Sequence, residues 1–324
     1  MKDDRVFRVA VWSTGGIGSI AVRAVAENPG TELVGVWVHS PDKAGRDAGE
    51  IVGIGPIGVT ATDDADALIA LRPDCVVYAA NGPERDAAAI PDYARLLEAG
   101  INVVTTSTNR LIHPASFEPE SWRAQLGSAA EAGGASLYAS GIEPGFAADH
   151  LVLMLATQSK SITKIHASEI AMYDDYPVAE TMRDAMGFGL PLDATPYLAY
   201  PGAIAFQWGP GLRLIADGLG YRIDEVRERF DRVATDRDLH VVFGTAEAGT
   251  CGALRTQAIA VIDGREAIII EHVNRLDPDL GLEWGDRVDR PVYQVHIEGE
   301  PDIVCTMNAK IGRASCRERV SSPV

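Results

Sequence analysis

The stretch from Arg5 to Ser40 constrains the fold of this chain more than any other. Residues 6–11 form a nearly continuous apolar run rich in β-branched side chains, which is typical of a parallel strand buried on both faces. A glycine-rich turn follows, and apolar residues then recur at helical spacing until the breaker sequence Asn28-Pro29-Gly30. A second apolar run covers residues 33–38. The pattern predicts a βαβ unit at the start of a parallel sheet.

The turn between the first strand and the helix has the spacing of a dinucleotide fingerprint. In that fingerprint the first glycine allows a tight turn, the second lets the pyrophosphate approach the backbone, and the third lets the helix pack on the strand. Free amides at the helix start would hold the phosphates. The expected cofactor-binding residues are Ser13 in the first place, Gly15 in the second and Gly18 in the third, with Thr14, Gly16 and Ile17 between them. The alternative is an ordinary βαβ unit with an unrelated glycine turn.

The end of the second strand bears on which nicotinamide cofactor is bound. An acidic residue there hydrogen-bonds the adenosine ribose, whereas a 2′-phosphate needs hydroxyls and cations. This chain has His39, Ser40 and Lys43 at that place, with Arg46 further on. We therefore expect NADP as the cofactor. NAD stays open, because Asp42 could contact a ribose and the two cations could be solvated loop charges.

Length and charge narrow the class of protein. At 324 residues the chain exceeds one typical hydrophobic core, so two domains are expected. A formal net charge of −17 without a basic patch argues against nucleic acid or an anionic membrane surface as a partner. The chain has no apolar run of bilayer length and no signal-peptide pattern, so a cytoplasmic protein is expected. Its four cysteines are isolated, which predicts no metal site and no disulfide.

Polar residues follow the later strands of the predicted sheet. Strands are expected at residues 60–62, 75–80, 101–106 and 135–140, alternating with helices that end near Leu71, Ala99 and Ala132. Ligands of open α/β sheets bind beyond the carboxyl ends of the strands. Asn81, Thr105 and Thr106 are therefore expected at the cofactor, and Thr108 and Asn109 at the substrate. A local turn is the alternative role for Asn81.

The alternation of strands and helices stops near residue 148, where a second domain is expected to begin. Beyond it the pattern changes to long strands at residues 162–172, 239–248, 253–262, 267–275 and 292–297, and residues 178–238 are expected to be mostly helical or irregular. The predicted fold class is α/β. A Rossmann domain with a doubly wound parallel sheet covers residues 1–147. A C-terminal α+β domain with a large open mixed or antiparallel sheet, for substrate binding and dimerisation, covers residues 148–309.

Residues 310–324 differ from the rest of the chain. They have no apolar period, and they resemble a translated sequencing adapter. We expect this tail to be non-native and exclude it from the fold prediction.

Eight stretches carry a resemblance to a known family: VWSTGGIG, VHSPDKAGRDAGE, PDCVVYAA, NVVTTS, GIEPGFAADHL, YDDYP, PGAIAFQWGP and IIEHVNR. Over nearly all of residues 5–309 the chain resembles a bacterial family with a dihydrodipicolinate-reductase-like N-terminal domain, related to 2,4-diaminopentanoate dehydrogenase and native amine dehydrogenases. The resemblance implies a nicotinamide-binding Rossmann domain, a C-terminal open sheet that mediates dimerisation, and hydride transfer at C=N bonds. The Lys-x-Asp-x-Pro-Ser-Gly-Thr signature of dihydrodipicolinate reductases is missing, so that activity is rejected.

The resemblance also shows where this chain departs from its relatives. Amine dehydrogenases place a catalytic glutamate just after the Thr-Thr pair that ends the fifth Rossmann strand, where this chain has Thr108 or Asn109. The nearest available carboxylate is Glu143, expected at the interdomain crevice, where relatives often have Asn in a GxNPGF motif. Burial would raise the pKa of Glu143 and suit it to acid and base catalysis. The alternative is that Glu143 caps the following helix or pairs with a nearby cation.

Other site candidates come from the second domain. Tyr173 and His272 are expected to act as proton donors or relays, and Tyr176, Phe146 and Trp208 to line the substrate pocket. A half-buried aromatic wall and a structural histidine are the alternatives.

Together these features predict an NAD(P)-dependent oxidoreductase that reductively aminates small ketones or aldehydes with ammonia, or runs the reverse oxidative deamination. Two alternatives remain open: a carbonyl or alcohol oxidoreductase, and a dinucleotide-binding sensor without turnover. A homodimer is expected.

Overall fold

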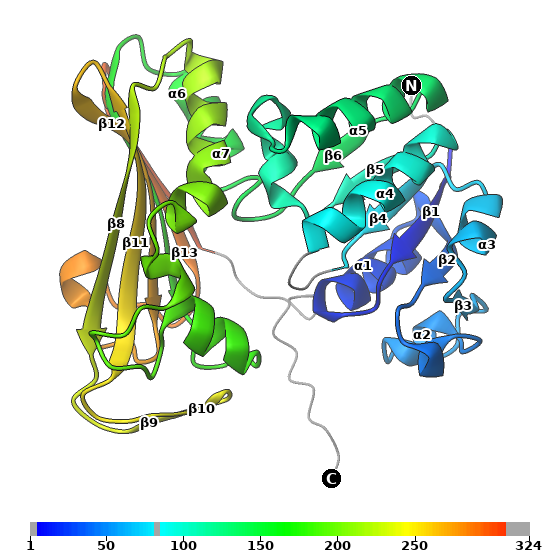
Figure 1. Ribbon diagram of the computed structural model, residues 1–324, viewed down its shortest axis with the longest axis horizontal. Helices are drawn as coiled ribbons and strands as arrows, with labels where there is room; N and C mark the ends of the chain where they lie inside the picture. Colours follow the sequence, from blue (N-terminus) through cyan, green and yellow to red (C-terminus); the bar gives the residue numbers. More distant parts are fainter. Residues whose placement is uncertain (1–4, 81–84, 309–324) are drawn as a thin grey trace. The chain divides into compact units, whose positions relative to one another are not determined.

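The computed structural model describes residues 5–80 and 85–308. Asn81 and the tail at residues 310–324 lie outside the described residues. The chain divides between Gly141 and Ile142 into two compact units, each built on its own six-stranded sheet (Figure 1). In the described part of the chain, no helix has both the length and the apolar character needed to cross a bilayer.

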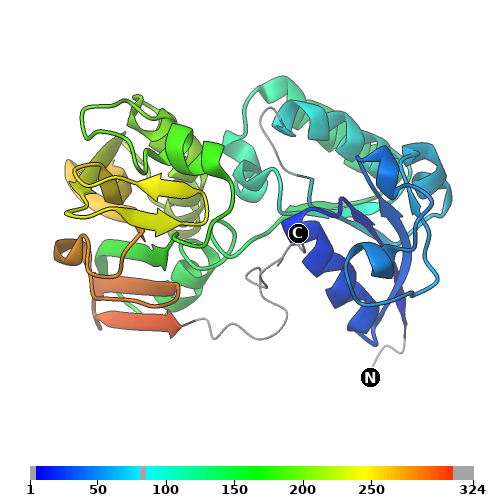
Figure 2. The ribbon, with the colours of Figure 1, turned by 90° about the horizontal axis from the view of Figure 1, so that it is seen from below.

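The first unit is a Rossmann fold on a parallel sheet with the order β3-β2-β1-β4-β5-β6. Its strands are β1 (Phe7–Trp12), β2 (Thr31–Trp37), β3 (Ala61–Thr62), β4 (Cys75–Tyr78), β5 (Asn102–Thr105) and β6 (Leu137–Ala139). One face packs against α1 (Gly16–Glu27) and α2 (Ala48–Ile51), and the other against α3 (Ala65–Ala70), α4 (Arg85–Glu98) and α5 (Glu120–Gly133) (Figure 2). The strand order reverses between β1 and β4, which is where doubly wound sheets bind ligands. The predicted doubly wound α/β fold is confirmed.

One helix of this unit begins earlier than the sequence predicts. The pattern predicts a helix from Pro91, whereas α4 begins at Arg85 and contains Pro91. A proline inside a helix removes one backbone hydrogen bond. Buried Ala89, Ile90 and Tyr93 anchor the turns on both sides of it against the sheet, so the helix continues through the proline.

The glycine turn after β1 depends on a close backbone approach. Gly18, in the first turn of α1, is buried against the carbonyl of Ser13. A Cβ at Gly18 would lie 2.1 Å from the Ser13 oxygen, which no side chain tolerates. Glycine at this position therefore lets α1 start directly on the end of β1, as the fingerprint spacing predicts.

The second unit is an α+β fold around a mixed sheet with the order β14-β13-β7-β12-β11-β8. Its strands are β7 (Ile162–Met172), β8 (Glu225–Ala234), β11 (Cys251–Ile262), β12 (Arg265–Arg275), β13 (Val292–Gly299) and β14 (Ile303–Asn308). Strands β7 and β12 pair in parallel, and the other neighbours are antiparallel. Helices α6 (His150–Ala156) and α7 (Ala203–Leu219) lie on one face, which we call the helix face (Figure 1). The predicted open mixed sheet is confirmed.

One prediction for this unit is incomplete and another is wrong. Residues 178–238, predicted to be mostly helical or irregular, include the helix α7 but also the long edge strand β8. Along β8, charged residues alternate with Val226 and Phe230, which pack on the core, and this pattern predicts a surface helix as readily as an edge strand. Residues 239–248, predicted as one strand, form the two-stranded hairpin of β9 (Leu239–Val241) and β10 (Gly244–Ala246), because the chain turns back at Val242 and Phe243.

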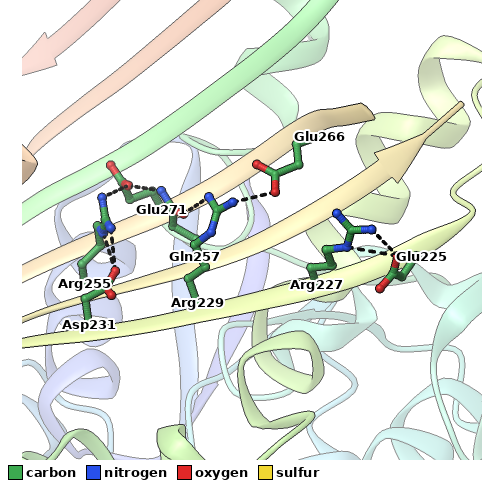
Figure 3. Close-up of polar contacts among 8 residues, drawn as sticks. All are labelled: Glu225, Arg227, Arg229, Asp231, Arg255, Gln257, Glu266 and Glu271. Carbon is green, nitrogen blue, oxygen red and sulfur yellow. Dashed lines mark hydrogen bonds and ion pairs between the residues drawn. The ribbon is translucent and has the colours of Figure 1, made fainter. Parts of the chain in front are cut away.

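The face of this sheet that points away from α6 and α7, the back face, carries a network of paired charges (Figure 3). Arg255 contacts Asp231 at 2.5 Å and Glu271 at 3.9 Å. Arg229 donates hydrogen bonds to Gln257 at 3.0 Å and to Glu266 at 2.6 Å. The strands β8, β11 and β12 place these side chains side by side, so most charges on this face are balanced within the chain.

We predict that Gly18→Ala destabilises the first unit by about 1–3 kcal/mol, because its Cβ overlaps the Ser13 carbonyl and forces the helix off the strand. Thermal unfolding measures the effect. Gly16→Ala is the matched control, since a Cβ at Gly16 meets nothing within 4 Å. Equal melting temperatures for the two variants would contradict the close approach.

Candidate active site

The glycine turn of the first unit presents free backbone amides at the start of α1. No side chain caps this helix, and Gly15, Gly16 and Ile17 are exposed. Ser13 has a φ of +97°, a conformation that glycine adopts more readily, and its hydroxyl accepts a hydrogen bond from the Gly15 amide at 3.3 Å. An uncapped helix start with exposed glycines is suited to a phosphate group.

The loop after β2 brings a cation to this turn. Lys43 ends the short 3-10 helix η1 (Pro41–Lys43), and its Nζ donates a hydrogen bond to the Thr14 hydroxyl at 3.3 Å. Ser40 stands directly before η1, and His39 is exposed beside the Trp37 ring. The structure therefore brings Lys43 and Thr14 together, as two of the residues expected at the cofactor.

The threonines that follow β5 belong partly to the core of the first unit. Thr105 and Thr108 are buried, and their hydroxyls lie 2.8 and 3.0 Å from the Tyr93 hydroxyl. Burial raises the pKa of Tyr93 to about 12, so this phenol stays neutral and shares its hydrogen bonds with both threonines. Thr106 is exposed and Asn109 is half-buried. The cofactor and substrate roles of these residues stay predictions.

Glu143 lies at the start of the second unit, in a loop whose backbone amides donate hydrogen bonds to two carboxylates of the same loop. Its Oε2 accepts a hydrogen bond from the Ala148 amide at 3.1 Å. Asp149 accepts one from the Gly145 amide at 2.6 Å. The other oxygen of Glu143, Oε1, lies 3.3 Å from Nε2 of His272, and only 2% of the Glu143 side chain is exposed. The neighbouring imidazole matches one of the two alternatives, a pairing with a nearby basic group. Glu143 does not cap the following helix α6 (His150–Ala156), whose N-cap is Asp149.

His272 sits between two carboxylates on the helix face. Its Nε2 faces Glu143, and its Nδ1 lies 3.7 Å from Oε1 of Glu169. Strand pairing fixes the second contact, because His272 of β12 and Glu169 of β7 are direct partners in the parallel ladder. Trp208 of α7 covers the imidazole with a ring-centroid distance of 4.5 Å. An indole over a charged imidazole adds to the stabilisation of the protonated form.

The pKa values of this cluster follow from burial and from the pairing. Burial by itself lowers the pKa of His272, but the carboxylates of Glu143 and Glu169 outweigh it and raise the pKa to about 9. Burial raises the pKa of Glu143, although the neighbouring His272 opposes the rise. The cluster therefore holds a proton at neutral pH in a site shielded from water.

Several buried polar atoms around His272 have no hydrogen-bond partner among the described residues. They are Thr256 Oγ1 and Asn274 Nδ2, together with Glu143 Oε1 and His272 Nε2, which face each other at 3.3 Å as an ion pair without the alignment of a hydrogen bond. Thr256 is the partner of His272 on β11, and Asn274 follows His272 by two residues on the same face of β12. Unpartnered buried polar groups are costly, and they are common where a ligand completes the hydrogen bonds.

Sequence reasoning places Glu143, His272 and Trp208 in the site but misses Glu169. The signal that could have found it is a lone acidic residue inside an apolar strand, between Ala167 and Ala171. The alternation of side chains along the strand places this residue on the core-facing side.

Tyr173 and Tyr176 stack on each other with a ring-centroid distance of 5.7 Å, and Tyr173 packs against the main core of the unit. The Phe146 side chain is exposed. The pocket roles of these aromatic residues stay predictions. Within residues 5–80 and 85–308, no group of histidine, cysteine and acidic side chains is arranged to hold a metal ion.

Two family models match the chain. Residues 7–109 match the N-terminal domain of dihydrodipicolinate reductase, and residues 146–314 match the C-terminal domain of 2,4-diaminopentanoate dehydrogenase. The second match covers just over half of the chain. The chain belongs to this dehydrogenase family. The resemblance predicted from the sequence is confirmed, and with it the expected class, an oxidoreductase with a Rossmann domain.

The chain is also similar to individual dehydrogenases. An amine dehydrogenase of Streptomyces virginiae is 38% identical over 303 residues, which are 92% of this chain and 84% of that protein. The solved structure of an amine dehydrogenase from Mycobacterium smegmatis shares the fold with a TM-score of 0.74 and 21% identity, covering 93% of this chain and 86% of the other. A scyllo-inositol dehydrogenase from Lactobacillus casei, solved with NAD(H) and scyllo-inositol, has a TM-score of 0.55 at 14% identity, over 94% and 76% of the two chains.

We predict that the His272 cluster makes stability depend on pH. The pKa of His272, about 9, lies above the ordinary value of 6.5. The contribution of the protonated imidazole to the free energy of unfolding is therefore fully present below about pH 6.5 and is lost as the pH rises through about 9. The free energy of unfolding should fall by up to ~3 kcal/mol over this range. His272→Gln should be less stable at pH 7 and flatter between about pH 8 and 9.5. Chemical denaturation at several pH values measures this, and parallel curves for both proteins would contradict it.

Proposed function

We propose that this protein is an NAD(P)-dependent amine dehydrogenase that reductively aminates small ketones or aldehydes with ammonia and catalyses the reverse oxidative deamination. The observation that carries the proposal is the buried Glu143–His272 pair, which holds a proton in a dry site of a chain from this dehydrogenase family. The 38% identity to an amine dehydrogenase supports the substrate class.

The residues of the glycine turn fit a nicotinamide dinucleotide. The exposed residues Gly16 and Ile17 present backbone amides that suit the pyrophosphate, and Gly18 lets the helix start directly on the strand beside it. Lys43, beside Thr14, supplies positive charge for a phosphate group. With Ser40 nearby, this cation favours NADP, and NAD is the second candidate. The bound cofactor would supply the hydride that converts a C=N bond into an amine.

The side chains of the second unit would handle the protons of the reaction. Forming the C=N bond from a carbonyl and ammonia releases water, and the oxygen needs a proton to leave. Glu143 is suited to that step, because burial raises its pKa and keeps its Oε1 next to the proton on His272. The carboxylate form would favour a cationic C=N group before the hydride arrives. Trp208, Tyr173, Tyr176 and Phe146 are proposed to form the apolar wall of the substrate site.

A carbonyl or alcohol oxidoreductase is the second candidate function. Amine dehydrogenases of this family place a glutamate after the Thr-Thr pair, whereas this chain has Thr108 or Asn109 there. Thr108 has a hydroxyl in place of a carboxylate, and this hydroxyl is buried and hydrogen-bonded to Tyr93. It therefore cannot take the part of the family glutamate toward ammonia. This departure favours carbonyl reduction if Glu143 does not take over the role of the family glutamate.

NAD(P)H oxidation with short ketones and aldehydes, with and without ammonium, tests the two functions. Turnover that requires ammonium supports amine formation, and turnover without ammonium supports carbonyl reduction. Tight cofactor binding without turnover on the whole panel would contradict both and favour a dinucleotide sensor.

We predict that Glu143→Gln lowers kcat by about 10²–10⁴-fold, because an amide cannot act as an acid or base at neutral pH. The loop should keep its structure, since the amide oxygen can still accept the hydrogen bond from Ala148, and cofactor affinity should stay unchanged. Glu271→Gln is the matched control. Glu271 is also a buried carboxylate beside a histidine, but it lies on the back face. If Glu143→Gln turns over like the unaltered protein, Glu143 takes no part in the chemistry.

We predict that Lys43→Ala weakens NADPH binding by about tenfold or more and NADH binding much less, because the loss of a cation that contacts a phosphate costs about 1.5–3 kcal/mol. Fluorescence titration with both cofactors measures the two dissociation constants. Arg46→Ala, which removes an exposed cation from the same loop, is the control. An equal loss for both cofactors would place Lys43 at a group that they share.

We also propose that the protein is a homodimer that uses the back face of the second unit. Charges such as Arg229 and Glu266 are already paired within the chain, so two copies of this face can meet without net repulsion. Light scattering at micromolar concentration tests the state. A monomer there would contradict the proposal.

A further inference from the structure

We propose that Glu169 is a positioning residue of this active site: it holds the imidazole of His272 through Nδ1, so that the opposite nitrogen, Nε2, delivers its proton to Glu143. This proposal rests on the proposed function. It adds a residue whose carboxylate acts through His272 and does not itself contact the reacting atoms.

The three side chains contact one another in the order Glu143, His272 and Glu169. Glu143 Oε1 and His272 Nε2 are 3.3 Å apart, and His272 Nδ1 and Glu169 Oε1 are 3.7 Å apart. Each carboxylate therefore faces a different ring nitrogen. At these separations the two carboxylates act on the ring as negative charges on opposite sides, which favours the doubly protonated form of His272.

Burial makes this pairing consequential. About one tenth of the Glu169 side chain and 7% of the His272 side chain are exposed. Among the described residues, His272 is the basic side chain that pairs with Glu169. A buried carboxylate is costly without a positive partner, so Glu169 and the imidazolium form of His272 stabilise each other.

Within the part of the chain that the structure describes, the neighbours of His272 named below carry no positive charge. Thr256 lies beside it on β11, Trp208 of α7 covers its ring, and Tyr293 of β13 is the strand partner of Glu169 on the other side. Asp149, in the loop of Glu143, is a further negative group, and it raises the pKa of Glu143 after the larger effect of burial. Its carboxylate is bound by the Gly145 amide and by His150.

A second carboxylate–imidazole pair on the back face shows the contrast. Glu271 lies 3.3 Å from His166, but it also accepts a hydrogen bond from Gln257 and lies 3.9 Å from Arg255. About a third of the His166 side chain is exposed. Both carboxylates are buried, but Glu271 is shared among His166, Gln257 and Arg255, whereas the ion pair of Glu169 is with His272.

The proton transfer is balanced within the site. The Nε2–H bond of His272 breaks and an O–H bond forms at Oε1 of Glu143, which leaves a neutral imidazole and a neutral carboxylic acid. When Glu143 gives this proton to the leaving oxygen of the substrate, it becomes a carboxylate again. His272 takes up a proton from solvent after the product leaves, which restores the imidazolium and completes the cycle.

The test is the titration of His272 in the full-length protein. NMR of histidine labelled with ¹⁵N follows the imidazole, and the spectrum of His272→Gln assigns its signals. We expect Glu169→Gln to lower the pKa of His272 by about 1 pH unit or more, because one of two opposite charges is removed. The alkaline limb of the kcat/KM profile should move to lower pH by the same amount. Glu271→Gln should move neither.

Glu169→Asp provides a second variant that keeps the charge but withdraws it from Nδ1 by one methylene group. It should give an intermediate pKa, and it replaces Glu169→Gln if that variant does not fold. An unchanged pKa of His272 in the folded Glu169 variant, or an equal shift in Glu271→Gln, would overturn the proposal. The NMR titration needs no turnover, so its result is independent of whether amine dehydrogenase activity is found.

Discussion

The parallel pairing of β7 with β12 is the constraint on which the candidate active site depends. It joins two strands about a hundred residues apart in the chain and places Glu169 directly beside His272. Because side chains alternate across a strand, the same register sends both residues to the helix face, where α7 brings Trp208 over the imidazole. A shift of one residue between the two strands would turn one of these side chains to the opposite face and separate Glu169 from His272.

Glu271 and His272 are adjacent residues of β12, and their side chains lie on opposite faces of the sheet. Glu271 points to the back face and joins a largely buried network with Arg255 and Gln257 (Figure 3). His272 points into the core, where hydrophobic side chains such as Ile270 surround the polar group. Burial acts to raise the pKa of Glu271, but His166, Gln257 and Arg255 outweigh it and hold this pKa below its ordinary value. Burial raises the pKa of Glu143, which has one imidazole beside it. The partners of each carboxylate, and not its burial, therefore separate the structural pair from the chemical one.

Much of the first unit follows from local sequence, and particular residues show where this stops. Hydrophobic runs and breaker residues predict β1, α1 and β2 because each signal lies within the element that it describes. Gly18 is likewise assigned correctly, since the fingerprint encodes a backbone contact between Ser13 and Gly18, which are five positions apart in the chain. The charged alternation of β8 is missed, because only its pairing with β11 distinguishes an amphipathic edge strand from a solvated helix. Glu169 is missed for a similar reason, since its partner lies on another strand.

The sequence by itself determined the fold class, the glycine turn after β1 and the membership of a dehydrogenase family. These are properties of short segments, whose propensities and spacing are set by covalent neighbours. Only the tertiary structure decided that Glu143, His272 and Glu169 form one cluster, that Lys43 reaches Thr14, and that Thr105 and Thr108 bond Tyr93. The physical reason is that charge pairing and burial act through space, between side chains that the chain brings together only after its strands have paired.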